Sequence, residues 1–395
     1  MPINTDKILT THVGSLPRSQ RLLDANAQRQ EGTLAESDFQ QVLTEEVAAV
    51  VKEQRDLGID IVNDGEYGHA MTSPIDYGAW WTYSFARTAG LEVLDDVDQL
   101  ALLKEPGNGR LNSFAVRRDW NKFADFYKTI ELGNKKPVFV AATSAISYQG
   151  QEDVASDVRN LTSALEGSGA HSGFVAALSP GSAARIGNRF YPTDEEWVYA
   201  WADVLKEEYK AIAEAGLTIQ IDDPSFAEAW DQLVPEPTVE EYLRFTDLAI
   251  ESLNYALEGI PTELIRYHLC WGSWHGPHTT DIELKHIIGS LAKLKVGGYS
   301  FEAANARHAH EWKEWAHIDL DGRVLYPGVV SHSTNVVEHP ELVAQRIEQF
   351  ASVAGKENVV ASTDCGLGGR IHPSIARAKL AALSEGAAIA SERLF

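Results

Sequence analysis

Four residues with metal-binding side chains are spaced so that they can meet at one site. The only two cysteines of the chain are Cys270 and Cys365, and His268 stands two positions before the first of them. Alternate residues of a strand point to the same side, so His268 and Cys270 can act together. With Glu302 they make a set of two thiols, an imidazole and a carboxylate, which suits zinc. Each residue alone also fits an ordinary buried position, and the zinc prediction rests on the four together.

The elements that must position these residues follow a repeated strand and helix pattern. Short β-branched runs, each followed by a segment with helical spacing, predict strands at 8–15, 59–66, 138–143, 217–223, 263–272, 298–303, 325–331 and 358–365. Helices are predicted among others at 43–57, 194–215, 239–257 and 340–354. The pattern predicts an α/β fold, a single (β/α)8 barrel of the TIM type.

In such a barrel the active site lies at the carboxyl ends of the strands. All four candidate ligands fall at the ends of predicted strands, which favours one shared site. Two long connections, 67–136 and 144–192, are predicted to form loops and small helices over this mouth. Since no low-complexity linker and no internal repeat interrupts the chain, we expect residues 1–395 to form one domain.

Charge and composition limit the partners. The 395 residues carry 57 acidic and 34 basic side chains, a formal net charge of −23. Such an acidic protein is expected to bind neither nucleic acid nor an anionic membrane surface. No leader and no apolar run long enough for a bilayer is apparent in the sequence, so the cytoplasm is the predicted compartment.

Seven short motifs, taken in order, carry a resemblance to a known family. They are LTTHVGSLP at 9–17, DGE at 64–66, IQIDDP at 219–224, HLC at 268–270, SFE at 300–302, HS at 332–333 and DCGL at 364–367. The set resembles the catalytic barrel of cobalamin-independent methionine synthase and extends from about residue 8 to residue 390. The N-terminal half barrel of the full-length enzymes is expected to be absent.

The resemblance implies a role for each matching position. His268, Cys270, Glu302 and Cys365 are similar to the zinc ligands, and His332 to the residue that assists proton delivery to the methyl donor. Glu66 and Asp222 match positions that hold the amino group of homocysteine, and Ser15 lies in the loop that receives its carboxylate.

The implied activity is a zinc-dependent methyl transfer from a methyl-tetrahydrofolate type of donor to homocysteine, which forms methionine. Zinc converts a bound thiol to the thiolate, and Glu302, the weakest donor of the three anionic ligands, is expected to yield when the substrate sulfur arrives. The donor nitrogen must be protonated before it leaves, and the intrinsic pKa of His332 suits that task.

Several features depart from the family pattern and leave the donor open. Residues 142–149 read ATSAISYQ where a third strand leading to a Gly-Pro turn is expected, and Asp223 replaces the usual glutamate. Arg18 adds a cation that is able to bind a carboxylate or a sulfonate. Alternatives that stay open are an epoxyalkane:coenzyme M transferase, a zinc hydrolase and an inactive zinc barrel. A homo-oligomer and a methyl-carrier protein as partner also stay open.

Four further histidines receive no catalytic role. His275 and His278 lie in a Gly- and Pro-containing segment and are expected in a lid or at a substrate contact. His308 and His310 are expected to face solvent or to pack as ordinary polar side chains.

Overall fold

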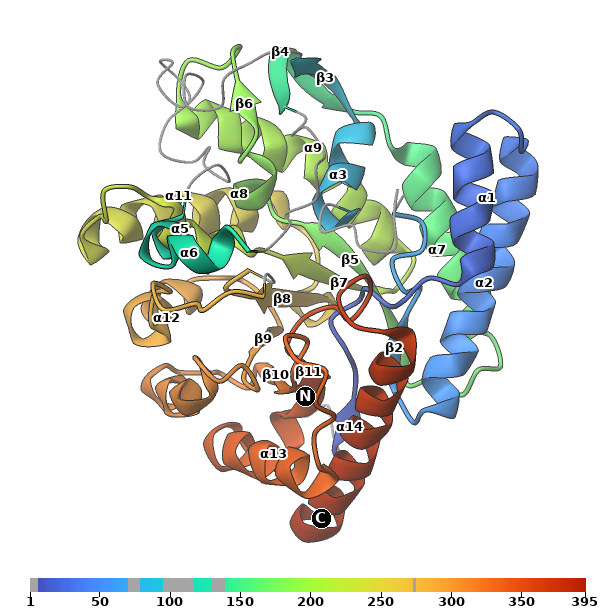
Figure 1. Ribbon diagram of the computed structural model, residues 1–395, viewed down its shortest axis with the longest axis vertical. Helices are drawn as coiled ribbons and strands as arrows, with labels where there is room; N and C mark the ends of the chain where they lie inside the picture. The colour runs from blue at the N-terminus through green and yellow to red at the C-terminus, as the bar shows by residue number, and fades with distance from the viewer. Residues whose placement is uncertain (1–5, 70–78, 95–116, 130–138, 273–274) are drawn as a thin grey trace.

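The computed structural model describes residues 6–69, 79–94, 117–129, 139–272 and 275–395 (Figure 1). Parallel strands lie at the centre, and helices surround them. The central sheet has the order β1-β11-β10-β9-β8-β7-β5-β2, and all its pairs are parallel. The strands are β1 Leu9–Thr10, β2 Ile61–Asn63, β5 Ser172–Leu178, β7 Thr218–Asp222, β8 Ile265–Leu269, β9 Gly298–Glu302, β10 Val324–Val330 and β11 Val360–Thr363.

Hydrogen bonds between β1 and the start of β2 join the two edges of this sheet. The Asp60 amide donates to the Thr10 carbonyl over 3.1 Å, and the Thr11 hydroxyl donates to the Ile61 carbonyl over 2.9 Å. The predicted fold class, an eight-stranded α/β barrel, is therefore confirmed.

The helices form the outer layer. The longer ones are α1 Gln20–Gln30, α2 Glu36–Asp56, α7 Gln151–Leu165, α9 Asp194–Glu214, α11 Val239–Ala256, α13 Pro340–Ala354 and α14 Pro373–Leu394. The shorter ones are α3 Ala79–Ala86, α5 Arg118–Lys122, α6 Ala124–Tyr127, α8 Pro180–Ala183, α10 Ser225–Gln232 and α12 Leu284–Leu291, with 3-10 helices η1 Thr262–Leu264, η2 Ala309–His317 and η3 Lys356–Asn358. Local signals set several ends: Thr238 and Glu241 form a capping box at the start of α11.

One predicted strand is present but belongs to a different sheet from the barrel. Of the predicted strand 138–143, residues 139–143 do not belong to the barrel and residue 138 lies outside the described residues, because β4 Phe139–Tyr148 pairs with β3 Thr88–Leu94 and β6 Gly187–Asn188 in a separate small sheet. The third barrel strand is β5, and helix α7 packs against it. This helix lies in the connection 144–192, which was predicted to form loops and small helices. The other seven predicted strands overlap the barrel strands that the structure shows.

A layer of apolar side chains fills the barrel below the mouth. It consists of Leu9, Ile61, Phe174, Val324, Tyr326 and Val360, all contributed by barrel strands. Among the described residues, no helix is both long enough and apolar enough to cross a bilayer. Because this layer is apolar, polar functional side chains are expected at the strand ends and in the loops that follow them.

Candidate metal centre and substrate pocket

The structure brings three of the four predicted zinc ligands together. Ligand atoms of His268, Cys270 and Cys365 all lie within 4.8 Å of one another. His268 lies on β8, Cys270 directly follows that strand, and Cys365 follows β11, so the strand ends supply the set. These three residues are called the thiol cluster below.

The surroundings of His268 leave one ring nitrogen available to a metal. Its Nδ1 lies 3.0 Å from the Ser300 hydroxyl, which fixes the ring, while Nε2 is buried and makes no hydrogen bond within the described residues. An unpaired buried nitrogen beside two sulfurs fits a metal ion with sulfur and nitrogen ligands.

The two thiols interact directly. A hydrogen bond from Cys270 holds the pKa of Cys365 well below its usual range, and the same contact together with burial raises the pKa of Cys270.

Glu302, the fourth predicted ligand, lies beside the thiol cluster but in a different group. Its carboxylate falls within 4.8 Å of ligand atoms of His332 and Asp364. Its Oε1 accepts from the Trp271 amide over 2.8 Å, and its Oε2 accepts from Asn305 over 2.7 Å. Burial raises the pKa of this carboxyl, and the nearby Cys365 charge adds to the rise.

Asp364 is a site residue that the sequence analysis did not select. Its Oδ1 accepts from the amides of Ala303 and Ala304 at 2.7 and 2.8 Å, so it holds the chain just after Glu302. Close packing requires glycine at position 328, where an added Cβ would lie 2.4 Å from the Asp364 Cα. The available signal was the place of Asp364 directly before Cys365 at a strand end.

His332 is fully enclosed at the mouth. Its Nδ1 is buried and makes no hydrogen bond within the described residues. Burial lowers the pKa of His332 to about 3, although the Cys365 charge opposes that change. The near-neutral pKa expected from the sequence is therefore not kept, and the ring is neutral at pH 7.

Two carboxyl groups, those of the buried Glu66 and the half-buried Asp222, define the predicted substrate pocket. Glu66 sits at a positive φ of 59°, and an added Cβ at Gly14 would lie 2.4 Å from its Oε1. Burial raises the pKa of both Glu66 and Asp222 well above the usual range. The Asp222 charge raises the pKa of Glu66 further, and the Cys365 charge raises that of Asp222. Within the described residues neither carboxylate takes part in a salt bridge.

Ser15 and Arg18 lie in the loop that follows β1. The Ser15 carbonyl accepts from the amides of Leu367 and Gly368 at 2.8 and 2.9 Å, so the loops after the first and last strands support each other. Arg18 Nη2 donates to the carbonyls of Glu66 and His69 at 2.6 and 2.7 Å. The guanidinium thus holds the turn that carries Glu66.

A second group of ligand-type residues lies behind Glu302. His308 stacks on Trp271 with ring centroids 3.8 Å apart, and its nitrogens lie 3.0 Å from Asp281 and 2.8 Å from Glu311. His278 Nδ1 lies 2.9 Å from the same Asp281 oxygen. We call His278, Asp281, His308 and Glu311 the histidine–carboxylate cluster.

The structure decides between the two alternatives for His308, which packs as a polar side chain. His308 is buried rather than facing solvent, and His278 is buried against Asp281, whereas His275 and His310 are exposed. Burial opposes the charge of His308, but hydrogen bonds to Asp281 and Glu311 outweigh it and raise the pKa to about 9.

The loop after the third barrel strand also needs correction. The segment 142–149 is not the third barrel strand, so its difference from the family pattern does not concern a strand of the barrel. The segment that follows β5 begins Ser179-Pro180-Gly181-Ser182 and contains a Pro-Gly pair. Asp223 faces it and accepts from the Ser182 hydroxyl over 2.8 Å and from Tyr267 over 3.0 Å.

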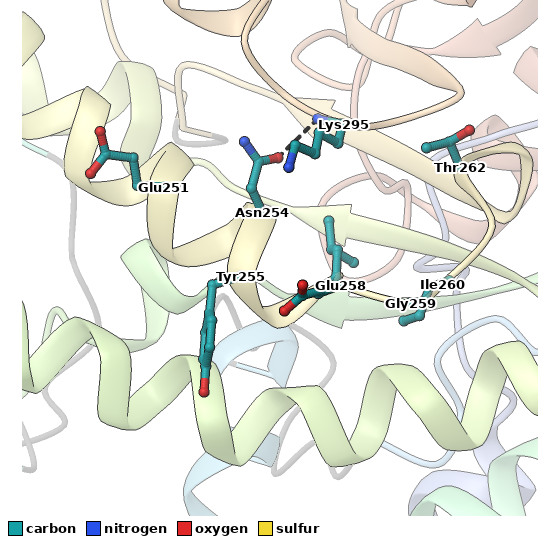
Figure 2. Close-up of a pocket in the computed structure, with 9 residues that line it drawn as sticks. Glu251, Asn254, Tyr255, Glu258, Gly259, Ile260, Thr262 and Lys295 are labelled. Atoms are coloured by element: carbon teal, nitrogen blue, oxygen red, sulfur yellow. Dashed lines mark hydrogen bonds between the residues drawn. The ribbon is translucent and has the colours of Figure 1, made fainter.

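A cavity of about 500 Å³ lies elsewhere, between α11 and the segments that enter β8 and β9 (Figure 2). Its lining residues include Glu251, Asn254, Tyr255, Glu258 and Lys295. Because these segments precede their strands, the cavity is at the amino-terminal end of the barrel, opposite to the thiol cluster.

Comparison with known proteins places this geometry in a family. The sequence profile described as "Cobalamin-independent synthase, Catalytic domain" matches residues 8–73 and 172–388. The profile leaves residues 74–171 unmatched, the stretch that contains β3 and β4.

Individual relatives are distant but cover nearly the whole chain. "Methionine synthase" of Thermococcus kodakarensis is 25% identical over 362 residues, which is 91% of this chain and 86% of that protein. The structure of a B12-independent methionine synthase from Shewanella sp. W3-18-1 in complex with selenomethionine matches with a TM-score of 0.69 at 19% identity, covering 98% and 99% of the two chains. A putative vitamin-B12 independent methionine synthase from Listeria monocytogenes gives a TM-score of 0.64 at 15% identity, covering 99% of both chains. The two structures share the fold of this chain.

Proposed function

Because this chain belongs to the family of the cobalamin-independent synthase catalytic domain, we propose that it is a zinc-dependent S-methyltransferase that methylates homocysteine to methionine. The observation that carries the proposal is the thiol cluster, in which His268 Nε2 is buried and unpaired beside Cys270 and Cys365. Small molecules, a thiol and a methyl donor, are the proposed partners.

The proposed zinc ligands are His268, Cys270 and Cys365, with Glu302 as the fourth. When bound there, zinc lowers the pKa of a coordinated thiol and so supplies a thiolate nucleophile at neutral pH. Asp364 and Asn305 keep the Glu302 carboxylate in place through the contacts described above.

The proposed acceptor pocket lies between Glu66 and Asp222. Glu66 is buried and Asp222 half-buried, and neither has a salt bridge within the part of the chain that the structure describes, so the ammonium group of an amino acid would stabilise their ionised forms. The backbone near Ser15 is proposed to receive the carboxylate of the substrate. Arg18 supports that pocket by holding the turn of Glu66.

His332 is proposed to deliver a proton to the departing donor nitrogen. Since its pKa is about 3, the neutral ring does not hold an extra proton at pH 7. It can pass one on only if its second ring nitrogen takes up another, and the proton that the homocysteine thiol loses when it becomes the thiolate would supply it. A methyl-tetrahydrofolate type of compound is the proposed donor.

Coenzyme M fits this pocket less well. It carries a sulfonate and no ammonium, so it brings no cation to stabilise the ionised forms of Glu66 and Asp222, whose pKa values burial raises. Arg18 uses Nη2 on the backbone carbonyls of Glu66 and His69.

The experiment is a pair of measurements on zinc-loaded protein. Calorimetry compares the Kd of homocysteine with that of coenzyme M and of 4-mercaptobutyrate, which is homocysteine without its amino group. We expect homocysteine to bind best, and Asp222→Asn to weaken only homocysteine, by about ten- to hundredfold. A turnover assay then supplies methyl-tetrahydrofolate, methylated corrinoid protein or a small epoxide as the alkyl source.

Tighter binding of coenzyme M, or turnover with the epoxide alone, would replace the proposal by an epoxide transferase. Zinc that no thiol perturbs, together with no turnover, would indicate an inactive barrel with a structural metal.

A further inference from the structure

We propose that Gln220, held by Arg266, is a positioning residue that fixes the Asp222 carboxylate and so sets the preference for a thiol that carries an ammonium group. The inference rests on the proposed function, in which Asp222 receives that ammonium. Gln220 lies on β7, two residues before Asp222, and its side chain is fully buried inside the barrel.

The guanidinium of Arg266 is fixed from several sides. It lies over the ring of Phe174, 3.9 Å from the centroid, and 5.0 Å from that of Tyr326. It also donates to the Thr11 hydroxyl over 3.2 Å and to the His12 carbonyl over 3.1 Å. These contacts on several sides hold the guanidinium in one position inside the barrel.

The contact between Arg266 and Gln220 decides which way the amide faces. A guanidinium has only donors, so the oxygen of the Gln220 amide must turn toward it, and Arg266 Nη2 donates to Gln220 Oε1. The amide nitrogen is thereby directed away from Arg266. Both of its hydrogens are left for acceptors at the mouth.

Those acceptors are Asp222 and the backbone of the β1 loop. Gln220 Nε2 donates to Asp222 Oδ1 over 2.8 Å and also to the Val13 carbonyl. Asp222 Oδ2 accepts no hydrogen bond from the described residues. Gln220 therefore holds one carboxylate oxygen and leaves the other for a ligand.

The bond to Val13 extends the effect of this amide. Val13 precedes Gly14 and Ser15, and the Glu66 carboxylate packs directly against Gly14. One buried amide thus connects Asp222 to the loop against which Glu66 packs. A change at Gln220 should disturb recognition of the amino acid portion of the substrate without touching the thiol cluster.

The test uses two variants of the zinc-loaded protein. Gln220→Glu keeps the length and an acceptor for Arg266, but replaces the donor that faces Asp222 by an oxygen. Gln220→Met keeps the length and removes both polar atoms. We expect each to raise the Kd of homocysteine about tenfold while the Kd of 4-mercaptobutyrate changes by less than about twofold.

The control is Tyr326→Phe, which removes a hydroxyl near Arg266 and keeps the ring. It should leave the ratio of the two Kd values unchanged. In the Asp222→Asn background, Gln220→Glu should have less than about a twofold further effect on homocysteine, since a residue that acts through Asp222 loses its target. Thermal unfolding reports whether each variant folds. If Gln220→Met does not fold, Gln220→Glu, which keeps its partner Arg266, carries the test.

The outcomes separate this inference from the proposed function. A wild-type protein that binds both thiols equally well would refute the ammonium pocket itself. Wild-type discrimination that survives in the Gln220 variants would overturn only the positioning role. An equal loss for both thiols would also overturn it, because Gln220 would then be a general structural residue.

Discussion

The thiol cluster and the histidine–carboxylate cluster lie on neighbouring loops and contain similar ligand types, yet they differ in how their atoms are used. In the histidine–carboxylate cluster both nitrogens of His308 face carboxylates, and Asp281 faces two histidines. In the thiol cluster, the buried Nε2 of His268 makes no hydrogen bond within the described residues. The polar groups of the histidine–carboxylate cluster pair with one another, whereas the thiol cluster leaves a lone pair available.

The comparison shows that a metal site needs unused lone pairs and not only the right residue types. A buried polar atom without a partner costs free energy, which a ligand can offset on binding. A cluster whose atoms already pair with one another stabilises the fold and offers little to an ion. The experiments below test this distinction, from the largest expected effect to the smallest.

The largest expected effect is the loss of zinc. We expect about one zinc per chain in the wild-type protein, and Cys270→Ser or Cys365→Ser to remove it, because a serine hydroxyl is a far weaker zinc ligand than a thiolate. Elemental analysis after dialysis against a mild chelator measures this. His308→Gln should keep its zinc. Full zinc in the double cysteine variant would disprove the assignment of the ligands.

The next effect is on stability and belongs to the other cluster. His308→Gln removes the cation between Asp281 and Glu311 and leaves two buried carboxylates without it. We expect the free energy of unfolding to fall by about 3–5 kcal/mol in urea titrations. The matched control is His310→Gln, the same change at an exposed histidine nearby, with an expected effect within about 0.5 kcal/mol. Equal effects of the two substitutions would contradict the cluster as described.

The third expectation concerns pH. The pKa of His308 in the folded protein is about 9 and the usual pKa of histidine is 6.5, so the histidine stabilises the fold fully below pH 6.5. That contribution, about 3 kcal/mol, is lost as the pH rises through 9. The difference in unfolding free energy between wild type and His308→Gln should therefore shrink between pH 6.5 and 9.5. A difference that grows with pH would show that His308 is neutral in the folded protein.

The smallest expected effect is a change of one in the number of sulfur atoms bound to the metal. If the thiol cluster accepts an outside ligand, X-ray absorption of the zinc protein should show one more sulfur neighbour after homocysteine is added. Homoserine, which has a hydroxyl in place of the thiol, is the control and should leave the sulfur count unchanged. An unchanged count with homocysteine would mean that the zinc does not bind the substrate sulfur.

The sequence predicted those parts of the site that depend on local spacing. His268 and Cys270 share a side of β8 because alternate residues of a strand do so, and the structure brings them together with Cys365. The β-branched residues at 138–143 correctly predicted a strand but not its sheet. Local propensity does not reveal that the partner of β4 is β3 rather than a barrel strand.

The partners of His308 were not predictable for the same reason. Its partner Asp281 lies 27 residues earlier in the chain, and no periodicity connects the two. Asp364 was overlooked although it adjoins Cys365, because its contacts are to backbone amides that only the folded β9 end presents. Partners set by the fold, rather than residue types, account for these errors.

The pairing of the first strand with the last has a consequence for synthesis of the protein. β1 lies beside β11, with Leu9 opposite Val360, and Ser15 is held by residues 367 and 368. A nascent chain on the ribosome therefore cannot complete either the ring or the site until its final segment emerges. Until then Cys270 has neither Cys365 nor the closed mouth around it, and its thiol is open to stray metals and oxidants. Slow translation of the last codons of the messenger RNA should prolong the time for which the Cys270 thiol is exposed.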